Sequence, residues 1–329
     1  MGPTSSGKSD IAIKLARQFN GEIISADSRQ IYRGLDIGTG KVTKAEQNMA
    51  KHWLLDIVSP RTIFSAAQFK KKADKIIADI LRRGKLPIIC GGTGFWIKAV
   101  VDNVSYPEVK PDWQLREKLG KKSAAALFKM LKKIDPQRAQ NIDAKNPVRL
   151  IRAIEICKAI GKVPPLSCHC ESAAAGEAIP LQQSTKYNIK SGELKYGIAA
   201  VAPRRSSLAM TNNYEFLQIS VDITKENLHK NIEQRLRKRW AAGMIKEVKN
   251  LKKSGLSWKK IQSFGLGYFW IPLYLQKKIT KQDLLEKVFL AEKDFAKRQM
   301  TWFKKDERIK WLKKYSAIKK ETAIFLKNN

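Results

Sequence analysis

The first nine residues of the chain carry a pattern that is suited to binding phosphate. Gly2-Pro3-Thr4-Ser5-Ser6-Gly7-Lys8-Ser9 fits the motif G-x-x-x-x-G-K-[ST]. In this motif the glycines let backbone N–H groups close around phosphate oxygens, the lysine supplies positive charge, and the hydroxyl ligates Mg²⁺. A chance glycine- and serine-rich turn could have the same letters. The apolar residues at 11, 12, 15, 16 and 19 predict a helix whose N-terminus points at the anion, which favours a phosphate or diphosphate site.

A carboxylate follows the next predicted strand. Residues 21–30 (GEIISADSRQ) predict a short buried strand that delivers Asp27 at its C-terminal end, where ligands of open α/β sheets bind. Asp27 is therefore a candidate general base or metal ligand. An aspartate that caps the following turn would give the same pattern, and from the residues alone the two interpretations have equal weight.

The surrounding elements predict a parallel sheet that is covered by helices. Ser65-Ala66-Ala67-Gln68 has the form of a capping box, and an apolar helical face continues to Arg83. Residues 52–57 and 85–94 predict two more strands, and the second ends in a glycine turn that places Thr93 at the same sheet edge as the phosphate site. This order indicates an α/β fold with a P-loop NTPase-like parallel core. Because only Met1 precedes Gly2, we expect the strand that leads into such a loop to be missing.

The pattern changes to lysine-rich amphipathic helices from about Asn103. Helices are predicted at 112–119 and 123–134, and a helix from Pro147 places Arg149 and Arg152 on one face, either for anion contact or simply exposed. Weak periodicity predicts a partly mobile loop at about 171–213. We therefore expect a discontinuous P-loop core domain, 1–103 and 214–329, and a mainly helical insertion domain, 104–213, that binds RNA.

Two helices near the C-terminus could complete the site. From Thr224 an apolar residue recurs every four positions as far as Trp240, and Arg235 lies near that stripe, where it could reach a phosphate or extend to solvent. The last long helix, from about Lys281, ends in residues 295–305 (FAKRQMTWFKK), which mix cations, an amide and aromatics. RNA-binding surfaces use that mixture, and so does an ordinary amphipathic basic helix.

The composition indicates an anionic partner. The 329 residues include 64 Lys and Arg against 30 Asp and Glu, a formal net charge of +34, which favours nucleic acid, although a lysine-rich proteome would also raise the charge of an ordinary enzyme. The four cysteines form no disulfide framework, and Cys168-His169-Cys170 lacks a second ligand pair for a metal. Without a signal peptide or a long apolar run, we expect a cytoplasmic protein that does not enter membranes.

Taken together, the motifs resemble those of the tRNA dimethylallyltransferase (tRNA isopentenyltransferase) family. They occur in the family's order and cover nearly the whole chain outside residues 171–213: Gly2–Ser9, Ile24–Thr39, Phe64–Phe69, Gly91–Thr93, Asn146–Arg152, Ile232–Arg235, Gly267–Tyr268 and Lys297–Trp302. The family transfers a dimethylallyl group from dimethylallyl diphosphate to N6 of the adenosine next to the anticodon, position 37 of tRNAs that read codons beginning with U. The resemblance implies a prenyltransferase that uses Mg²⁺, acts on the tRNA anticodon stem-loop and needs no obligate protein partner.

The resemblance also implies roles for individual residues. Asp27 would be the general base that takes the N6 proton, and Ser9 would ligate Mg²⁺. A weakly nucleophilic amine needs its proton removed as the C–N bond forms, and the departing diphosphate needs its charge neutralised. The implied diphosphate contacts are Gly2, Thr4, Ser6, Gly7, Lys8, Ser9 and Arg235. The implied tRNA contacts are Asp27, Ser28, Arg29, Gln30, Thr93, Arg116, Arg149, Arg152, Gln262, Gly265, Gly267, Lys297, Arg298, Gln299, Trp302 and Lys304.

Three other functions share part of this pattern. An adenylate isopentenyltransferase has the phosphate loop and the base but prenylates a free nucleotide, whereas the basic C-terminal motif, the helical insertion and the net charge favour tRNA. A P-loop kinase would use residues 23–27 as its Walker B strand. The third is an inactive remnant, a protein that only binds RNA, because the strand that would anchor the loop Gly2–Ser9 is expected to be missing.

Overall fold

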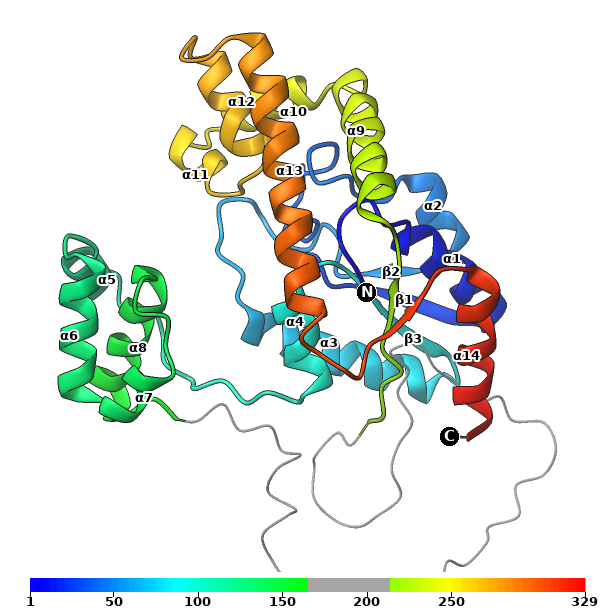
Figure 1. The fold of residues 1–329 in the computed structure, drawn as a ribbon, viewed down its shortest axis with the longest axis horizontal. Helices are drawn as coiled ribbons and strands as arrows, with labels where there is room; N and C mark the ends of the chain where they lie inside the picture. The colour runs from blue at the N-terminus through cyan, green and yellow to red at the C-terminus, as the bar shows by residue number, and fades with distance from the viewer. Residues whose placement is uncertain (165–213, 329) are drawn as a thin grey trace, which may run out of the picture. The chain divides into compact units, whose positions relative to one another are not determined.

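The computed structural model describes residues 1–164 and 214–328, whose helices and strands are drawn in Figure 1. These residues form two compact units. One combines Met1–Val101 with the described part of Pro180–Asn329, and the other is the described part of Asp102–Ile179. The Cys168-His169-Cys170 sequence and the segment 171–213 lie outside the described residues. Within the described ranges, no helix has both the length and the apolar character that crossing a bilayer requires.

The first unit is built on a parallel sheet in the order β2-β1-β3. Its strands are β1 (Gly21–Ser25), β2 (His52–Trp53) and β3 (Leu86–Cys90). The prediction of a parallel α/β core is therefore confirmed. The strand expected at 52–57 is shorter than predicted, because Leu54 and Asp56 have φ values of 63° and 54°, a left-handed conformation that ends a strand.

Different helices cover the two faces of the sheet, because successive strand residues point to opposite sides. Ile23 and Ile88 pack in one cluster with α1 and α14. Ile24 and Ile89 pack in a larger cluster with α3 and α4. The helices are α1 (Lys8–Gln18), α3 (Ala66–Arg82), α4 (Gly94–Val101) and α14 (Tyr315–Asn328). Since both faces are covered, the ends of the strands are where a ligand can approach.

A second parallel sheet pairs β4 (Ile219–Val221) with β5 (Lys310–Leu312). The described residues contain no strand before α1, in agreement with the sequence. Met1 lies beside β4 instead, and its ammonium group donates to the carbonyl oxygen of Ile219 at 2.7 Å. Burial lowers the pKa of this ammonium. The loop Gly2–Ser9, called the phosphate loop below, is thus attached at its start to β4 by a hydrogen bond.

Further helices, joined by loops, make up the rest of the first unit. Thr224 caps α9, and Leu228, Ile232 and Leu236 are buried along it, as the four-residue spacing predicts. A short turn, residues 263–266, joins α11 to α12. The bounds are α2 (Lys44–Met49), α9 (Lys225–Ala241), α10 (Met244–Lys253), α11 (Trp258–Gln262), α12 (Gly267–Leu275) and α13 (Lys281–Phe303).

The second unit is a group of short helices with a core of its own. Leu119, Leu127, Leu131, Leu150 and Ile154 are among the residues buried in that core. The helices expected at 112–119 and 123–134 are confirmed. The bounds are α5 (Trp113–Gly120), α6 (Ala124–Ile134), α7 (Pro136–Gln140) and α8 (Pro147–Ile160).

Glu22, on β1, is a buried carboxylate that ties the sheet to its surroundings. It accepts two hydrogen bonds from the Arg83 guanidinium at 2.6 and 2.8 Å, one from Lys85 at 3.0 Å and one from the Trp53 indole at 2.8 Å. The hydrogen bonds from Arg83, helped by those from Lys85 and Trp53, lower the pKa of Glu22 to about 2. The carboxylate is therefore charged at neutral pH even though it is buried.

We expect Glu22→Gln to lower the free energy of unfolding by about 3 kcal/mol, because two cations lose their buried partner. The folded-state pKa lies below the ordinary value of 4.5, so the charged carboxylate stabilises the fold above that pH and the contribution is lost as the pH falls towards about 2. Urea unfolding at neutral pH should show a lower midpoint for the variant, and the two midpoints should converge near the lower pH. Equal midpoints at neutral pH would contradict this account.

Candidate active site

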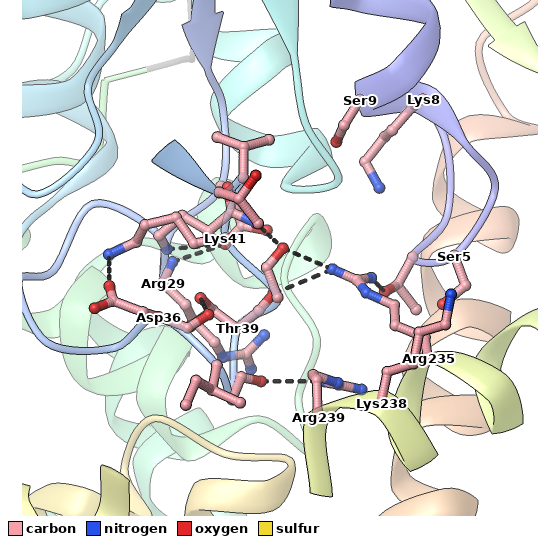
Figure 2. A pocket seen from close by; sticks show the side chains of 18 of the residues that line it. Ser5, Lys8, Ser9, Arg29, Asp36, Thr39, Lys41, Arg235, Lys238 and Arg239 are labelled. Carbon is pink, nitrogen blue, oxygen red and sulfur yellow. Dashed lines mark hydrogen bonds and ion pairs between the residues drawn. The ribbon is translucent and has the colours of Figure 1, made fainter. Parts of the chain in front are cut away.

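The phosphate loop leads directly into α1. Gly7 ends the loop in the left-handed region (φ 81°), and Lys8 begins the helix. Lys8 and Ser9 line one cavity (Figure 2), where the Lys8 ammonium donates to the carbonyl oxygen of Pro3 at 3.0 Å. The hydroxyl of Ser5, which lines the same cavity, has no hydrogen-bond partner within the described residues. These donors suit an anion.

Arg235, on α9, lies across the cavity from Lys8 in Figure 2. Its guanidinium donates to the hydroxyl of Thr4 at 2.7 Å and to the carbonyl oxygen of Gly40 at 2.9 Å. Burial lowers the pKa of Arg235, and the charge of Arg239 acts in the same direction. Burial also lowers the pKa of Lys8, and Arg235 adds to that effect. Two desolvated cations in one cavity favour a bound anion.

Asp27 follows β1, as predicted, and lines the same cavity. Its Oδ1 accepts the backbone N–H groups of Arg29 at 2.9 Å and Gln30 at 3.3 Å. The aspartate therefore caps the turn, which confirms that interpretation, and it also faces the cavity. Its negative charge opposes the lowering of the pKa values of Lys8 and Arg235.

The cavity has a volume of about 770 Å³, within the range that small-molecule sites occupy. Its walls come from parts of the chain that are far apart in sequence: the phosphate loop, the segments that follow β1 and β3, and the helices α9 and α13. Lys8 and Arg235 face the cavity from opposite sides, and Asp27 also lines it. The arrangement can hold an anionic leaving group with a carboxylate close by.

Comparison with known proteins shows the family. The family model described as IPP transferase matches residues 30–306, which is most of the chain. The chain belongs to the IPP transferase family. The resemblance found in the sequence is thereby confirmed.

Relatives of this IPP transferase extend over nearly its whole length. A tRNA dimethylallyltransferase of Acetivibrio thermocellus is 37% identical over 95% of this chain and 90% of its own. One of a Thermoanaerobacter species is 33% identical over 99% and 96%. The crystal structure of the tRNA delta(2)-isopentenylpyrophosphate transferase of Staphylococcus epidermidis aligns with a TM-score of 0.64 at 31% identity, over 100% of this chain and 98% of that one. A eukaryotic dimethylallyltransferase solved acting on tRNA shares the fold, with a TM-score of 0.67 at 22% identity over 92% and 68%.

Among the predicted tRNA contacts of this IPP transferase, Arg29 and Gln30 line the cavity, and hydrogen bonds hold their neighbours in place. The backbone N–H of Ser28 donates to the Thr93 hydroxyl at 3.0 Å, which joins the segments after β1 and β3. The guanidinium of Arg29 lies 5.0 Å from the centre of an aromatic ring of α13. The side-chain amide of Gln30 donates to the carbonyl oxygen of Gly40 at 3.3 Å. The structure therefore brings these residues together beside Asp27.

The predicted contacts at the end of α13 are exposed. Lys297, Arg298, Trp302 and Lys304 all reach solvent, and the Trp302 side chain remains 40% exposed. They offer three cations and an indole ring on one helix end.

Gln299 is buried, unlike the other predicted contacts on α13. Its side-chain oxygen accepts the backbone N–H of Thr4 at 2.8 Å, and its amide nitrogen donates to the carbonyl oxygen of Gly92 at 2.8 Å. Gln299 thus braces the phosphate loop against the turn after β3. Gly267 is also buried, at the start of α12, whereas Gln262 and Gly265 are half-buried near it.

The predicted contacts in the second unit centre on the buried carboxylate of Glu155. Arg116 donates to it twice, at 2.8 Å each, and Arg152 donates to it as well. Burial alone would raise the pKa of Glu155, but these hydrogen bonds lower it to about 2. The side chains of Arg116 and Arg152 stay 31% and 34% exposed, and Arg149 is exposed. Glu155 therefore orients two guanidinium groups that are still accessible from solvent.

Sequence reasoning missed three polar residues on α9. Arg239 is buried and donates to a buried glutamate of α13 at 2.9 Å. Lys238 lines the cavity beside the phosphate loop (Figure 2), and the amide of Asn231 donates to the carbonyl oxygen of Ser5 at 3.1 Å. Asn231 and Arg239 lie four residues before and after Arg235, so the helical period could have found both.

Proposed function

We propose that this enzyme transfers a dimethylallyl group from dimethylallyl diphosphate to N6 of the adenosine next to the tRNA anticodon, position 37 of tRNAs that read codons beginning with U. One observation carries the proposal: the Asp27 carboxylate and the phosphate loop line the same cavity, so a base and a diphosphate site flank one space. The names of the relatives, tRNA dimethylallyltransferase, support both the group that is transferred and its acceptor.

In this reaction a bond forms between N6 and the first carbon of the dimethylallyl group, while the bond from that carbon to the diphosphate oxygen breaks. We assign Asp27 as the base that accepts the N6 proton, because the amine becomes acidic as the new bond forms. Lys8 and Arg235 hold the diphosphate and neutralise the charge that develops on it. Because both cations are desolvated, their attraction for that charge is stronger than it would be in water.

Mg²⁺ fits the phosphate loop. Ser9 lines the cavity next to Lys8. Within the described residues, no group of three or more His, Cys, Asp or Glu side chains could by itself bind a metal ion. Mg²⁺ commonly takes one or two protein ligands and completes its shell with phosphate oxygens and water. We assign Ser9 as its ligand, and a bound Mg²⁺ would neutralise part of the diphosphate charge. The proposed loop contacts are Gly2, Thr4, Ser6 and Gly7, of which Thr4 already donates its backbone N–H to Gln299.

We assign the basic end of α13 to tRNA. A stacked adenine cannot reach a carboxylate inside a cavity, so the target base must leave its stack. Lys297, Arg298 and Lys304 are exposed cations that suit phosphates, and the exposed Trp302 indole suits an unstacked base. The formal net charge of +34 supports the same anionic partner.

Incubation with tRNA and labelled dimethylallyl diphosphate, followed by nucleoside analysis, tests the proposal. We expect N6-isopentenyladenosine next to the anticodon. Labelled AMP in place of labelled tRNA would indicate an adenylate isopentenyltransferase. Phosphoryl transfer from ATP without a prenyl donor would indicate a kinase, and RNA binding without any product would indicate an inactive remnant. Each of these three results would overturn the proposal.

We expect the affinity for an anticodon stem-loop to fall steeply with salt, because cations that contact phosphates release counterions from the RNA. Between about 50 and 200 mM salt, six to ten phosphate contacts would cost roughly 10³- to 10⁵-fold in affinity. Fluorescence anisotropy over a salt series measures the slope. A flat profile would mean that the surplus lysines and arginines do not contact the RNA.

A further inference from the structure

A carboxylate outside the cavity organises the segment that holds Arg235. Glu247, in the first turns of α10, accepts the backbone N–H groups of three successive residues: Asp36 at 2.8 Å, Ile37 at 2.7 Å and Gly38 at 3.0 Å. It also accepts the hydroxyl of Tyr268 at 2.6 Å. Successive backbone N–H groups form a concave site that suits an anion, and here the anion is supplied by the protein itself.

The segment that Glu247 holds makes direct contact with two arginines of α9. Arg235 donates to the carbonyl oxygens of Thr39 at 3.4 Å and Gly40 at 2.9 Å, and Arg239 donates to that of Gly38 at 2.8 Å. These acceptors follow directly after the N–H groups that Glu247 binds. In Figure 2, Thr39 lies between Arg235 and Asp36.

The fit around this segment is close. A Cβ atom on Gly38 would lie 2.5 Å from the Tyr268 ring, and one on Gly40 would lie 2.1 Å from the Arg235 guanidinium. Tyr268 is itself fixed, since it is almost fully buried and its hydroxyl reaches Glu247. A shift of the segment would therefore move Arg235.

Only a carboxylate satisfies all four donors. Its two oxygens accept several hydrogen bonds and present no hydrogen, so Oε2 binds the first two N–H groups while Oε1 binds the third and the tyrosine. A glutamine would place an NH₂ group against backbone N–H. The hydrogen bonds to Ile37 and Gly38 are partly buried, so their N–H groups would lose an acceptor that water replaces only in part, and we expect the segment to rearrange.

We propose that Glu247 is a positioning residue that sets the place of the Arg235 guanidinium by anchoring residues 36–40. Its main effect reaches the diphosphate of the prenyl donor, because among the described residues the segment is joined to the predicted RNA contacts only by the 3.3 Å hydrogen bond from Gln30 to Gly40. The inference rests on the proposed function, in which Arg235 binds that diphosphate.

The test compares Glu247→Gln with Glu233→Gln, which removes the same charge from an exposed glutamate of α9 that pairs with Arg237. We expect Glu247→Gln to weaken the binding of inorganic pyrophosphate with Mg²⁺, measured by calorimetry, and to raise the KM for dimethylallyl diphosphate, each by roughly 10- to 100-fold, because small misplacements of binding groups have effects of that order. The Kd for an anticodon stem-loop should change less than about twofold, and Glu233→Gln should resemble the wild type in every measurement.

A double-mutant cycle with Arg235→Lys separates positioning from a general loss of structure. If Glu247 acts through the guanidinium, adding Glu247→Gln to Arg235→Lys should cost less than about twofold more. Fully additive losses, equal losses of donor and RNA affinity, or an unimpaired Glu247→Gln would each overturn the inference. Should Glu247→Gln fail to fold, Glu247→Asp keeps the charge but draws it back from the segment, and unchanged pyrophosphate affinity in that variant would also overturn the inference.

The wild type separates the two levels of the proposal. If it neither binds pyrophosphate nor transfers the dimethylallyl group, the proposed function fails. If it does both and Glu247→Gln is unimpaired, only the role of Glu247 fails.

Discussion

Asp27→Asn should lower kcat for dimethylallyl transfer by roughly 10²- to 10⁴-fold, the usual contribution of a general base. An asparagine keeps the shape of the side chain, and its oxygen can still accept the N–H groups of Arg29 and Gln30 that cap the turn. What it loses is the ability to take a proton from N6. We therefore expect the variant to fold and to bind tRNA with nearly normal affinity, while single-turnover experiments show little product.

The matched control is Asp222→Asn. This carboxylate is partly exposed, lies outside the cavity and is 3.8 Å from the Lys313 ammonium. The substitution removes the same charge and should leave kcat unchanged. Near-normal turnover by Asp27→Asn would show that Asp27 is not the base, and loss of tRNA affinity equal to the loss of kcat would indicate a binding role instead.

Lys8→Ala should reduce kcat/KM for dimethylallyl diphosphate by roughly 10²- to 10³-fold, the cost of removing one preorganised group that stabilises developing charge. The ammonium lies at the N-terminus of α1 and points into the cavity (Figure 2), and its desolvated environment strengthens its attraction for an anion. Without this ammonium the diphosphate would bind more weakly, and as a leaving group it would depart more slowly. Steady-state kinetics with varied donor at saturating tRNA measure both effects.

Lys14→Ala is the control for this variant. Lys14 is exposed on the same helix, and its ammonium lies 5.6 Å from the centre of the Tyr315 ring, away from the phosphate loop. Its removal changes the net charge equally and should leave the donor kinetics unchanged. An unchanged KM with normal kcat in Lys8→Ala would exclude the proposed diphosphate contact.

The parts of the site that the sequence could predict are those that depend on local patterns. The phosphate loop and α1 follow from glycine spacing and an apolar stripe, and Asp27 follows from its place at the end of a strand. The capping box of α3 was equally local. The predicted length of β2 was wrong, because the positive φ of Leu54, directly after the strand, has no signal in its residue type.

Contacts between distant segments could not be predicted. The sequence indicated that Gln299 belongs to a basic RNA-binding motif, but only the fold shows that its amide binds the backbone of Thr4 and Gly92. Likewise, Glu247 follows an unremarkable glycine turn, and its four hydrogen bonds depend on how α10 packs against residues 36–38. A single sequence indicates which residues form helices, strands and turns, and it does not indicate which distant residues come into contact in the fold.

The brace from Gln299 to Thr4 spans 295 positions of the chain, almost from one end to the other. A ribosome that adds about 5 to 20 residues per second needs roughly 15 to 60 seconds to make the second partner after the first. Throughout that interval the nascent phosphate loop lacks one of its supports. Chains released early by a premature stop would therefore contain the recognisable motif without its finished shape, so such fragments should neither capture the donor nor compete with intact molecules for it.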